Sequence, residues 1–416
     1  MNLLLKSSSI QHPASIKITG SKSETNRLLL LQALYPNLVL ENTSNSDDSE
    51  VMQKALTNTH HPSPITKTID VHHAGTAMRF LTAFFAIQEG KEVVLTGSTR
   101  MKERPIKILV DALNQLGAEI SYEENEGFPP IKIKGKKLTQ SKVSLPADVS
   151  SQYISALLLI APKLENGLEL TLEGEITSIP YIKMTLALLN EIGVKTSFEN
   201  NLIVVKSSEV EMVFKSITVE SDWSSASYWF SIVALSEIGT QITLSSYKED
   251  SLQGDSALVN IYQDFGVETT FNTHNSITIS KVNFKNQKSL IVNLQSSPDI
   301  AQTIAVTCFG LGMGCDLSGL HTLKIKETDR LEALKTELTK LGATVSVTND
   351  SLHLKSSTKI KENILISTYQ DHRMAMAFAP LALKIPIIIE DAEVVSKSYP
   401  SFWEDLEKVG FRLNQK

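Results

Sequence analysis

Five stretches of the chain share one pattern of apolar and polar positions. Each is an amphipathic run, then a glycine, then apolar and polar residues in alternation. The glycines are Gly117, Gly193, Gly266, Gly342 and Gly410, spaced 76, 73, 76 and 68 residues apart. An amphipathic run before a glycine is typical of a helix with a glycine cap, and alternation is typical of a strand. The pattern therefore predicts a helix–strand unit repeated about every 70 residues.

A second kind of helix is predicted between these units. It opens with small or polar residues and continues as a strongly apolar run, which indicates a helix buried on most faces. Six copies begin near Ser23, Gly75, Ser151, Ser224, Asp299 and Asp371. A sixth copy of the first helix, without its glycine, is expected at residues 48–57.

The regular alternation of helices and strands predicts an α/β fold in which helices pack on sheets. Six units divide naturally into two lobes of three. We expect the first lobe to hold residues 20–219 and the second to hold residues 1–19 and 220–416.

Composition and charge argue against several classes of function. A net charge of −6 and 6% aromatic residues give little support for a nucleic-acid partner. The apolar stretches are far shorter than the ~20 residues that span a bilayer, and no signal peptide is apparent. Two cysteines in 416 residues fit a reducing compartment. The sequence therefore predicts a cytoplasmic protein with no nucleic-acid or membrane partner, and a monomer by default.

Cations stand on the first turns of the apolar helices, where the helix dipole disfavours them. Lys22, Arg27, Arg79 and Arg373 are placed this way. Serine or aspartate there is explained by capping alone, but a cation is not. Free N–H groups with Lys and Arg make an anion site, so a substrate with several anionic groups is expected. The cation-dense residues 99–106 and 324–331 fit such a site or a solvated surface.

Six segments together resemble the 5-enolpyruvylshikimate-3-phosphate (EPSP) synthase family along the whole chain. They are residues 20–27 (GSKSETNR), 74–79 (AGTAMR), 100–106 (RMKERPI), 150–153 (SSQY), 326–331 (KETDRL) and 371–376 (DHRMAM). The resemblance implies a two-lobed enolpyruvyltransferase fold. Each lobe would hold three βαβαββ units around a pseudo-threefold axis, with the active site in the cleft between the lobes.

The resemblance also implies an activity, that of a 3-phosphoshikimate 1-carboxyvinyltransferase. This enzyme transfers the enolpyruvyl group of phosphoenolpyruvate to the 5-hydroxyl of shikimate 3-phosphate. Addition and elimination give EPSP and phosphate, in the shikimate pathway of aromatic amino-acid biosynthesis. No metal and no organic cofactor is expected.

Site residues carry over by matching position. Shikimate 3-phosphate would contact Lys22, Ser23, Arg27, Ser150, Ser151, Gln152, Ser178, Tyr181, Asp299 and Lys326. Phosphoenolpyruvate would contact Lys22, Gly75, Arg100, Gln152, Arg330, Arg373 and Lys397. The implied catalytic groups are Asp299, which accepts the hydroxyl proton, Glu327, which moves the methylene proton, and Lys22, an acid and electrostatic partner.

Some positions depart from the family pattern. His72 and His73 stand where the family usually has Gly-Asn, and we expect His73 near the phosphate of phosphoenolpyruvate. Thr322 stands where many relatives have Asn. His372 either moves a proton or orients its neighbours, and we expect the second role.

Two other functions remain open. The sister family acts on UDP-N-acetylglucosamine and usually uses a cysteine in a mobile loop. Here Cys308 lies in an apolar helix and Cys315 follows a glycine-rich turn, away from any Arg. A non-catalytic relative should lack acid–base residues, yet Lys22, Asp299 and Glu327 are present.

Overall fold

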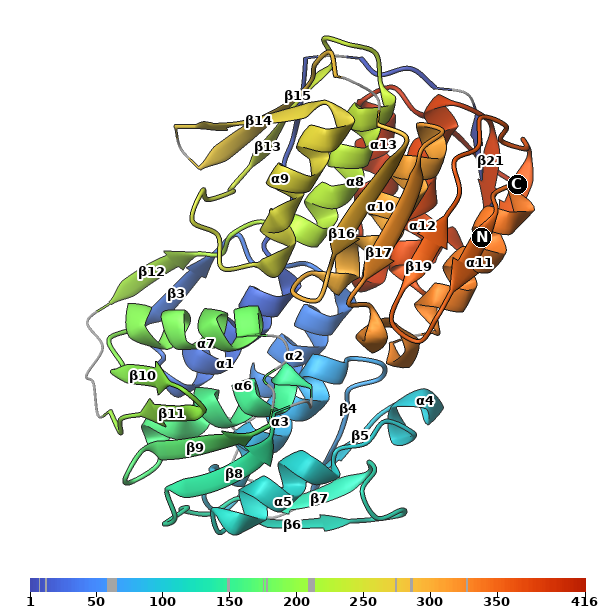
Figure 1. Ribbon diagram of the computed structural model, residues 1–416. Coiled ribbons are helices and arrows are strands. Elements are labelled where there is room, and N and C mark those ends of the chain that lie inside the picture. Colours follow the sequence, from blue (N-terminus) through green and yellow to red (C-terminus); the bar gives the residue numbers. More distant parts are fainter. Residues whose placement is uncertain are drawn as a thin grey trace. The chain divides into compact units, whose positions relative to one another are not determined.

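The computed structural model divides into two compact lobes (Figure 1). It describes residues 1–6, 8–11, 13–57, 66–147, 150–174, 176, 179–208, 214–273, 275–284, 287–326 and 328–416. The first lobe is Ser21–Val219, and the second joins Met1–Gly20 to Glu220–Lys416. Each lobe has its own hydrophobic core.

The first lobe holds two four-stranded sheets and one two-stranded sheet among its described residues. One has the order β4 (Lys67–Asp70), β5 (Glu92–Thr96), β7 (Ile131–Lys134), β6 (Glu119–Tyr122). The other has the order β10 (Thr196–Glu199), β11 (Leu202–Val205), β9 (Leu168–Glu173), β8 (Lys142–Pro146). The third pairs β12 (Lys215–Thr218) with β3 (Leu38–Glu41).

The second lobe holds three four-stranded sheets among its described residues. The first runs β14 (Val267–Asn272), β15 (Ser276–Lys281), β13 (Gln241–Ser245), β2 (Ala14–Ile16). The second runs β16 (Ser289–Asn293), β17 (Gly314–Ser318), β19 (Leu352–Leu354), β18 (Val345–Val347). The third runs β20 (Ile364–Ile366), β21 (Ile387–Ile389), β1 (Leu3–Lys6), β22 (Arg412–Gln415).

The helices alternate with these strands. In the first lobe they are α1 (Lys22–Leu34), α2 (Asp47–Thr57), α3 (Gly75–Ala86), α4 (Thr99–Lys102), α5 (Lys107–Gln115), α6 (Ser151–Ile160) and α7 (Ile179–Glu191). In the second they are α8 (Trp223–Leu235), α9 (Leu258–Ile261), α10 (Ala301–Gly310), α11 (Arg330–Lys340), α12 (His372–Phe378) and α13 (Phe402–Lys408). Short 3₁₀ turns are η1 (Ala161–Lys163), η2 (Gly254–Ala257), η3 (Tyr262–Phe265), η4 (Pro298–Ile300), η5 (His321–Ile325), η6 (Ala379–Leu383) and η7 (Ala392–Lys397).

Each four-stranded sheet has the same pairing. One edge strand runs parallel to its neighbour, as β4 does to β5, and the other two strands pair antiparallel. A parallel pair needs a long crossover, which the apolar helix provides, as α3 does between β4 and β5. The order β4-α3-β5-α5-β6-β7, with the short α4 inserted, is the expected βαβαββ repeat.

Where the chain passes between the lobes, the last strand before the crossing pairs in the lobe that the chain leaves. Strand β2 precedes α1 in the sequence but pairs in parallel with β13 of the second lobe. Strand β12 precedes α8 but pairs in parallel with β3 of the first lobe. The N-terminal β1 likewise completes the last sheet, between β21 and β22.

The two predicted helix types are confirmed. The five glycines that end the first type all have positive φ, from 69° at Gly266 to 105° at Gly410, a conformation that glycine adopts without a Cβ clash. The third copy differs from a single helix, because it is built from η2, α9 and η3 in succession. The helix expected at residues 48–57 is α2.

Three helices of the apolar type pack together inside each lobe: α1, α3 and α6 in the first, and α8, α10 and α12 in the second (Figure 1). In α3, α6, α8 and α12, which are described throughout, one side chain alone is not buried. In every case it is the second residue: Thr76, Gln152, Ser224 and Arg373. These helices therefore bury their length and leave a polar group at the N-terminus.

No helix in the described part of the chain is both long and apolar enough to cross a membrane.

Candidate active site

Side-chain hydrogen bonds join four helices of the first lobe. Gln152 Nε2 of α6 donates to Thr76 Oγ1 of α3 at 3.1 Å. Arg27 of α1 donates from Nη2 to Ser155 Oγ of α6 and from Nε to Thr185 Oγ1 of α7, both at 2.8 Å. The structure therefore brings together helices that are far apart in the sequence.

Arg27 is a buried cation, with 2% of its surface exposed. Burial lowers its pKa to about 10, while Tyr181 and Glu24 oppose that shift, so it stays charged near neutral pH. Its guanidinium lies 5.8 Å from the Tyr181 ring centroid, and Nη1 donates to the Ser23 carbonyl at 2.7 Å. Three predicted shikimate-phosphate contacts, Ser23, Arg27 and Tyr181, thus lie together.

The other predicted residues of α6 lie at its start. Ser150 is the N-cap, and its Oγ accepts from the Gln152 N–H at 3.4 Å. Ser151 is the first helical residue and is buried. Ser178, predicted beside Tyr181, lies outside the described residues.

Asp48 brings Lys22 and His73 together. Lys22 Nζ lies 3.3 Å from Asp48 Oδ2, and His73 Nε2 lies 3.8 Å from Asp48 Oδ1. Asp48 is buried in the first turn of α2. Sequence reasoning missed it, because an acidic residue at a helix start is ordinary and its partners lie on other elements.

Gly75 lies against Arg104 rather than Arg100. A Cβ on Gly75 would stand 2.5 Å from Arg104 Nη1. Buried Arg79 donates to the Gly75 carbonyl at 3.1 Å, and its pKa falls to about 10 through burial and the nearby Arg104 charge. Arg100 is 62% exposed and pairs with Glu103 at 3.0 Å. Arg104 is therefore the residue of this loop that meets Gly75, and the contact of Arg100 with phosphoenolpyruvate stays a prediction.

The second lobe gathers three cations on one carboxylate. Asp299 Oδ1 lies 2.8 Å from Arg330 Nη1 and 3.4 Å from Lys326 Nζ, and Asp299 Oδ2 lies 3.5 Å from Arg373 Nη2. Burial alone would raise the pKa of Asp299, but Lys326, Arg373 and Arg330 outweigh burial and hold it well below its usual range. Asp299 is therefore an ionised carboxylate in this state.

Asp371 pairs with Arg330 and caps the helix that carries Arg373. It is the N-cap of α12, where its Oδ1 accepts from the Arg373 N–H at 2.8 Å. Its Oδ2 accepts from Arg330 Nε at 2.6 Å. His372 follows it and is buried, with Nδ1 4.0 Å from Asp371 Oδ1.

Asp255 is a second carboxylate near Arg373 that sequence reasoning missed. It lies in η2 and accepts a short hydrogen bond from the Ser224 hydroxyl. Burial raises its pKa to about 6 and Asp299 adds to the shift, whereas Arg373 opposes it. The sequence around it carried no signal beyond an acidic residue after a glycine.

Two predicted residues are not placed in this cluster. Lys397 Nζ donates to the Gln370 carbonyl at 2.8 Å, just before Asp371 in the chain. Glu327 lies outside the described residues. Cys308 and Cys315 are buried and free, which confirms that Cys308 is a small core residue.

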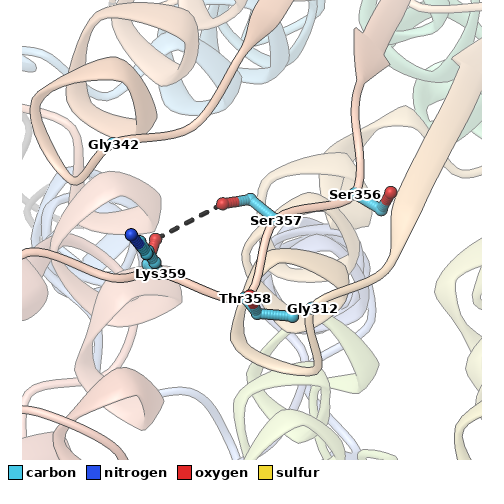
Figure 2. Close-up of a pocket in the computed structure, with 6 residues that line it drawn as sticks. All are labelled: Gly312, Gly342, Ser356, Ser357, Thr358 and Lys359. Carbon is cyan, nitrogen blue, oxygen red and sulfur yellow. Dashed lines mark hydrogen bonds between the residues drawn. The ribbon is translucent and has the colours of Figure 1, made fainter.

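A cavity of about 470 Å³ lies elsewhere in the second lobe (Figure 2). Its lining is Gly312, Gly342, Ser356, Ser357, Thr358 and Lys359. Gly312 and Gly342 follow the C-termini of α10 and α11, whereas Asp299 and Arg330 stand at the N-termini of these helices. A ten-residue helix rises about 15 Å, so the cavity and the carboxylate–cation cluster are at opposite ends. Among the described residues, no group of three or more His, Cys, Asp or Glu side chains is arranged to hold a metal ion.

Known proteins resemble this chain over its whole length. The family model for EPSP synthase (3-phosphoshikimate 1-carboxyvinyltransferase) matches residues 36–406. The 3-phosphoshikimate 1-carboxyvinyltransferase of Bacteroides fragilis strain YCH46 is 46% identical, with 99% of both chains covered. That of Actinobacillus pleuropneumoniae serotype 5b is 35% identical, with 95% of this chain and 96% of the relative covered.

Solved structures share the fold. EPSP synthase from Acinetobacter baumannii superposes with a TM-score of 0.79 at 20% identity, covering 100% of both chains. The enolpyruvyl transferase NikO from Streptomyces tendae gives 0.75 at 13% identity, covering 100% of this chain and 98% of the other. The predicted two-lobed α/β fold is thereby confirmed, and the chain belongs to the EPSP synthase family.

Proposed function

We propose that this protein transfers the enolpyruvyl group of phosphoenolpyruvate to the 5-hydroxyl of shikimate 3-phosphate, releasing phosphate. Full-length identity of 46% to a 3-phosphoshikimate 1-carboxyvinyltransferase supports this reaction. The observation that carries it is the crowding of Lys326, Arg330 and Arg373 around Asp299. When Lys326, Arg330 and Arg373 release Asp299, their charges can bind the phosphate and carboxylate groups of an anionic substrate.

Each substrate has its own set of proposed contacts, with Lys22 and Gln152 in both sets. Arg330 and Arg373 grip phosphoenolpyruvate, since guanidinium groups bind phosphate and carboxylate in bidentate fashion. In the first lobe Lys22, Gln152 and the Gly75 backbone contribute. Shikimate 3-phosphate is held by Ser23, Arg27, Ser150, Ser151, Ser178, Tyr181 and Lys326, with Lys22, Gln152 and Asp299 in contact as well.

In this proposal Arg104, rather than Arg100, contacts phosphoenolpyruvate beside Gly75. Its guanidinium lies against Gly75, at the start of a buried helix where an anion is favoured. Arg100 is instead compensated by Glu103 at the surface. An anion bound at the start of α3 would therefore meet Arg104 first.

The chemistry needs two proton movements. The 5-hydroxyl oxygen attacks C2 of phosphoenolpyruvate as its proton passes to Asp299, and the C3 methylene takes a proton from Glu327, with Lys22 stabilising the charge. This gives a tetrahedral adduct. Loss of a C3 proton and cleavage of the C2–phosphate bond then release phosphate and restore the enol ether.

In this proposal, substrate binding makes Asp299 a stronger base. A carboxylate held by three cations is a weak base, because those cations keep its pKa low. Once Arg330 and Arg373 face the phosphoenolpyruvate anion, they stabilise Asp299 less. The basicity of Asp299 then rises when the substrate that needs it is present.

The reaction uses no metal or organic cofactor in this proposal, and the protein works as a cytoplasmic monomer with no nucleic-acid or membrane partner. Two buried free thiols, Cys308 and Cys315, are consistent with a reducing compartment.

The test is phosphate release with both substrates, then with each omitted. We expect release only when both are present. A folded protein that releases none would refute the proposal, and release with UDP-N-acetylglucosamine in place of shikimate 3-phosphate would assign it to the sister reaction.

A further inference from the structure

Ser224 stands between a carboxylate and a guanidinium. Every residue of α8, which is described throughout, is buried except Ser224. Its hydroxyl donates to Asp255 Oδ2 and accepts from Arg373 Nη2 at 3.2 Å. The three side chains come from η2, α8 and α12, so only the tertiary fold joins them.

The direction of these hydrogen bonds follows from chemistry. A serine hydroxyl has one hydrogen to donate, and an arginine side chain has donors but no acceptor. The hydrogen must therefore point to Asp255, which leaves a lone pair of Ser224 Oγ facing Arg373. Without Asp255 the hydroxyl could rotate, and its hydrogen could face the guanidinium.

Asp255 is itself held in place. The neighbouring Gln253 accepts from the Trp223 N–H and donates to the Ser221 carbonyl, both at 3.0 Å. These two hydrogen bonds hold residues 253–255 against the N-terminus of α8. Asp255 is 6% exposed, so solvent does not readily replace its hydrogen bond.

Besides its ion pair with Asp299 Oδ2 at 3.5 Å, the Arg373 guanidinium makes two hydrogen bonds. Nη1 donates to the Asp299 backbone carbonyl at 3.0 Å, and Nη2 donates to Ser224 Oγ. The first contact depends on the backbone before α10, and the second depends on how the Ser224 hydroxyl is oriented. A guanidinium must be aimed to bind an anion in bidentate fashion.

We propose that Asp255 is a positioning residue for Arg373, acting through the Ser224 hydroxyl to aim the guanidinium at the phosphoenolpyruvate anion. This inference rests on the proposed function. Asp255 touches neither substrate in it.

The test compares Asp255→Ala, Asp255→Asn and Ser224→Ala with Asp250→Ala, an exposed aspartate earlier in the same segment. We expect Asp255→Ala to raise the KM for phosphoenolpyruvate about tenfold and that for shikimate 3-phosphate less than twofold. Asp255→Asn should restore most of the loss, because its amide oxygen still accepts from Ser224. Asp250→Ala should match the wild type.

A double-mutant cycle sharpens the result. Because Ser224 and Asp255 act through one hydrogen bond, Ser224→Ala combined with Asp255→Ala should be no worse than the poorer single variant. Additive losses, equal KM shifts for both substrates, or Asn behaving like Ala would overturn the inference. A wild type without turnover on both substrates would instead refute the proposed function, and calorimetric binding of phosphoenolpyruvate to the same variants would still test the positioning role.

Discussion

Lys22 Nζ lies 3.3 Å from the carboxylate of Asp48, and the other oxygen of that carboxylate faces His73 at 3.8 Å. His73 and Lys22 therefore share one carboxylate, and His73 adds a positive charge there only when it is protonated. His73, which stands where the family usually has Asn, therefore lies close to a predicted catalytic lysine.

His73→Asn should raise the KM for phosphoenolpyruvate roughly two- to fivefold, the range expected from an ion pair worth about 0.5–1 kcal/mol. Asn removes the imidazole from beside Asp48, so Asp48 is left to Lys22 and holds it away from the anion. Steady-state kinetics with each substrate varied would show this. Equal shifts for phosphoenolpyruvate and shikimate 3-phosphate would contradict the placement of His73.

Arg104→Ala should raise the KM for phosphoenolpyruvate at least about tenfold, because a lost hydrogen-bonded charge pair costs about 1.5–3 kcal/mol. Arg100→Ala, at the second residue of α4 in the same loop, is the matched control. It should change KM less than about twofold, since exposed ion pairs contribute little. The reverse order of effects would restore the assignment of Arg100.

Lys22→Met, Asp299→Ala and Glu327→Ala should each lose most turnover while the protein stays folded. Asp299→Ala removes the proposed base and leaves Lys326, Arg330 and Arg373 without their shared carboxylate. Turnover and circular dichroism on the same samples would check this. Near-normal rates in all three variants would refute the acid–base roles.

Lys281 predicts a pH dependence of stability. It is buried on β15, with Nζ donating to the Phe265 carbonyl at 2.6 Å, and burial lowers its pKa to about 8. The folded state therefore binds this proton more weakly than the unfolded chain, whose lysine titrates near 10.4. The cost of burying the charge is complete below pH 8 and disappears as pH rises towards 10.4, and it is at most about 3 kcal/mol.

The measurement is the free energy of unfolding against pH for the wild type and Lys281→Met. The wild type should gain stability relative to the variant between about pH 8 and 10. Lys288→Met, at an exposed lysine nearby, is the control and should show no such trend. A constant difference between wild type and Lys281→Met would contradict a buried, depressed lysine.

The cavity near Gly312 and Gly342 lies away from the residues of the predicted chemistry (Figure 2). Both glycines belong to the repeat pattern or its helix ends, and the hollow between their loops lies at the C-termini of α10 and α11. The predicted chemistry lies at the N-termini, where helix dipoles and free N–H groups favour anions.

Local interactions explain what the sequence determined by itself. Helix starts, glycine ends and alternating strands depend on residues within a few positions of each other, so the repeat and the buried helices could be predicted. The family motifs likewise placed Lys22, Arg27, Asp299 and Arg373 at helix starts.

Only the tertiary structure decided which side chains meet. Asp48 contacts Lys22 from another helix, Arg104 rather than Arg100 reaches Gly75, and Asp255 reaches Arg373 through Ser224. These contacts depend on how helices from different repeats pack, which no local pattern encodes. A carboxylate's partners, and with them its pKa, are set by that packing.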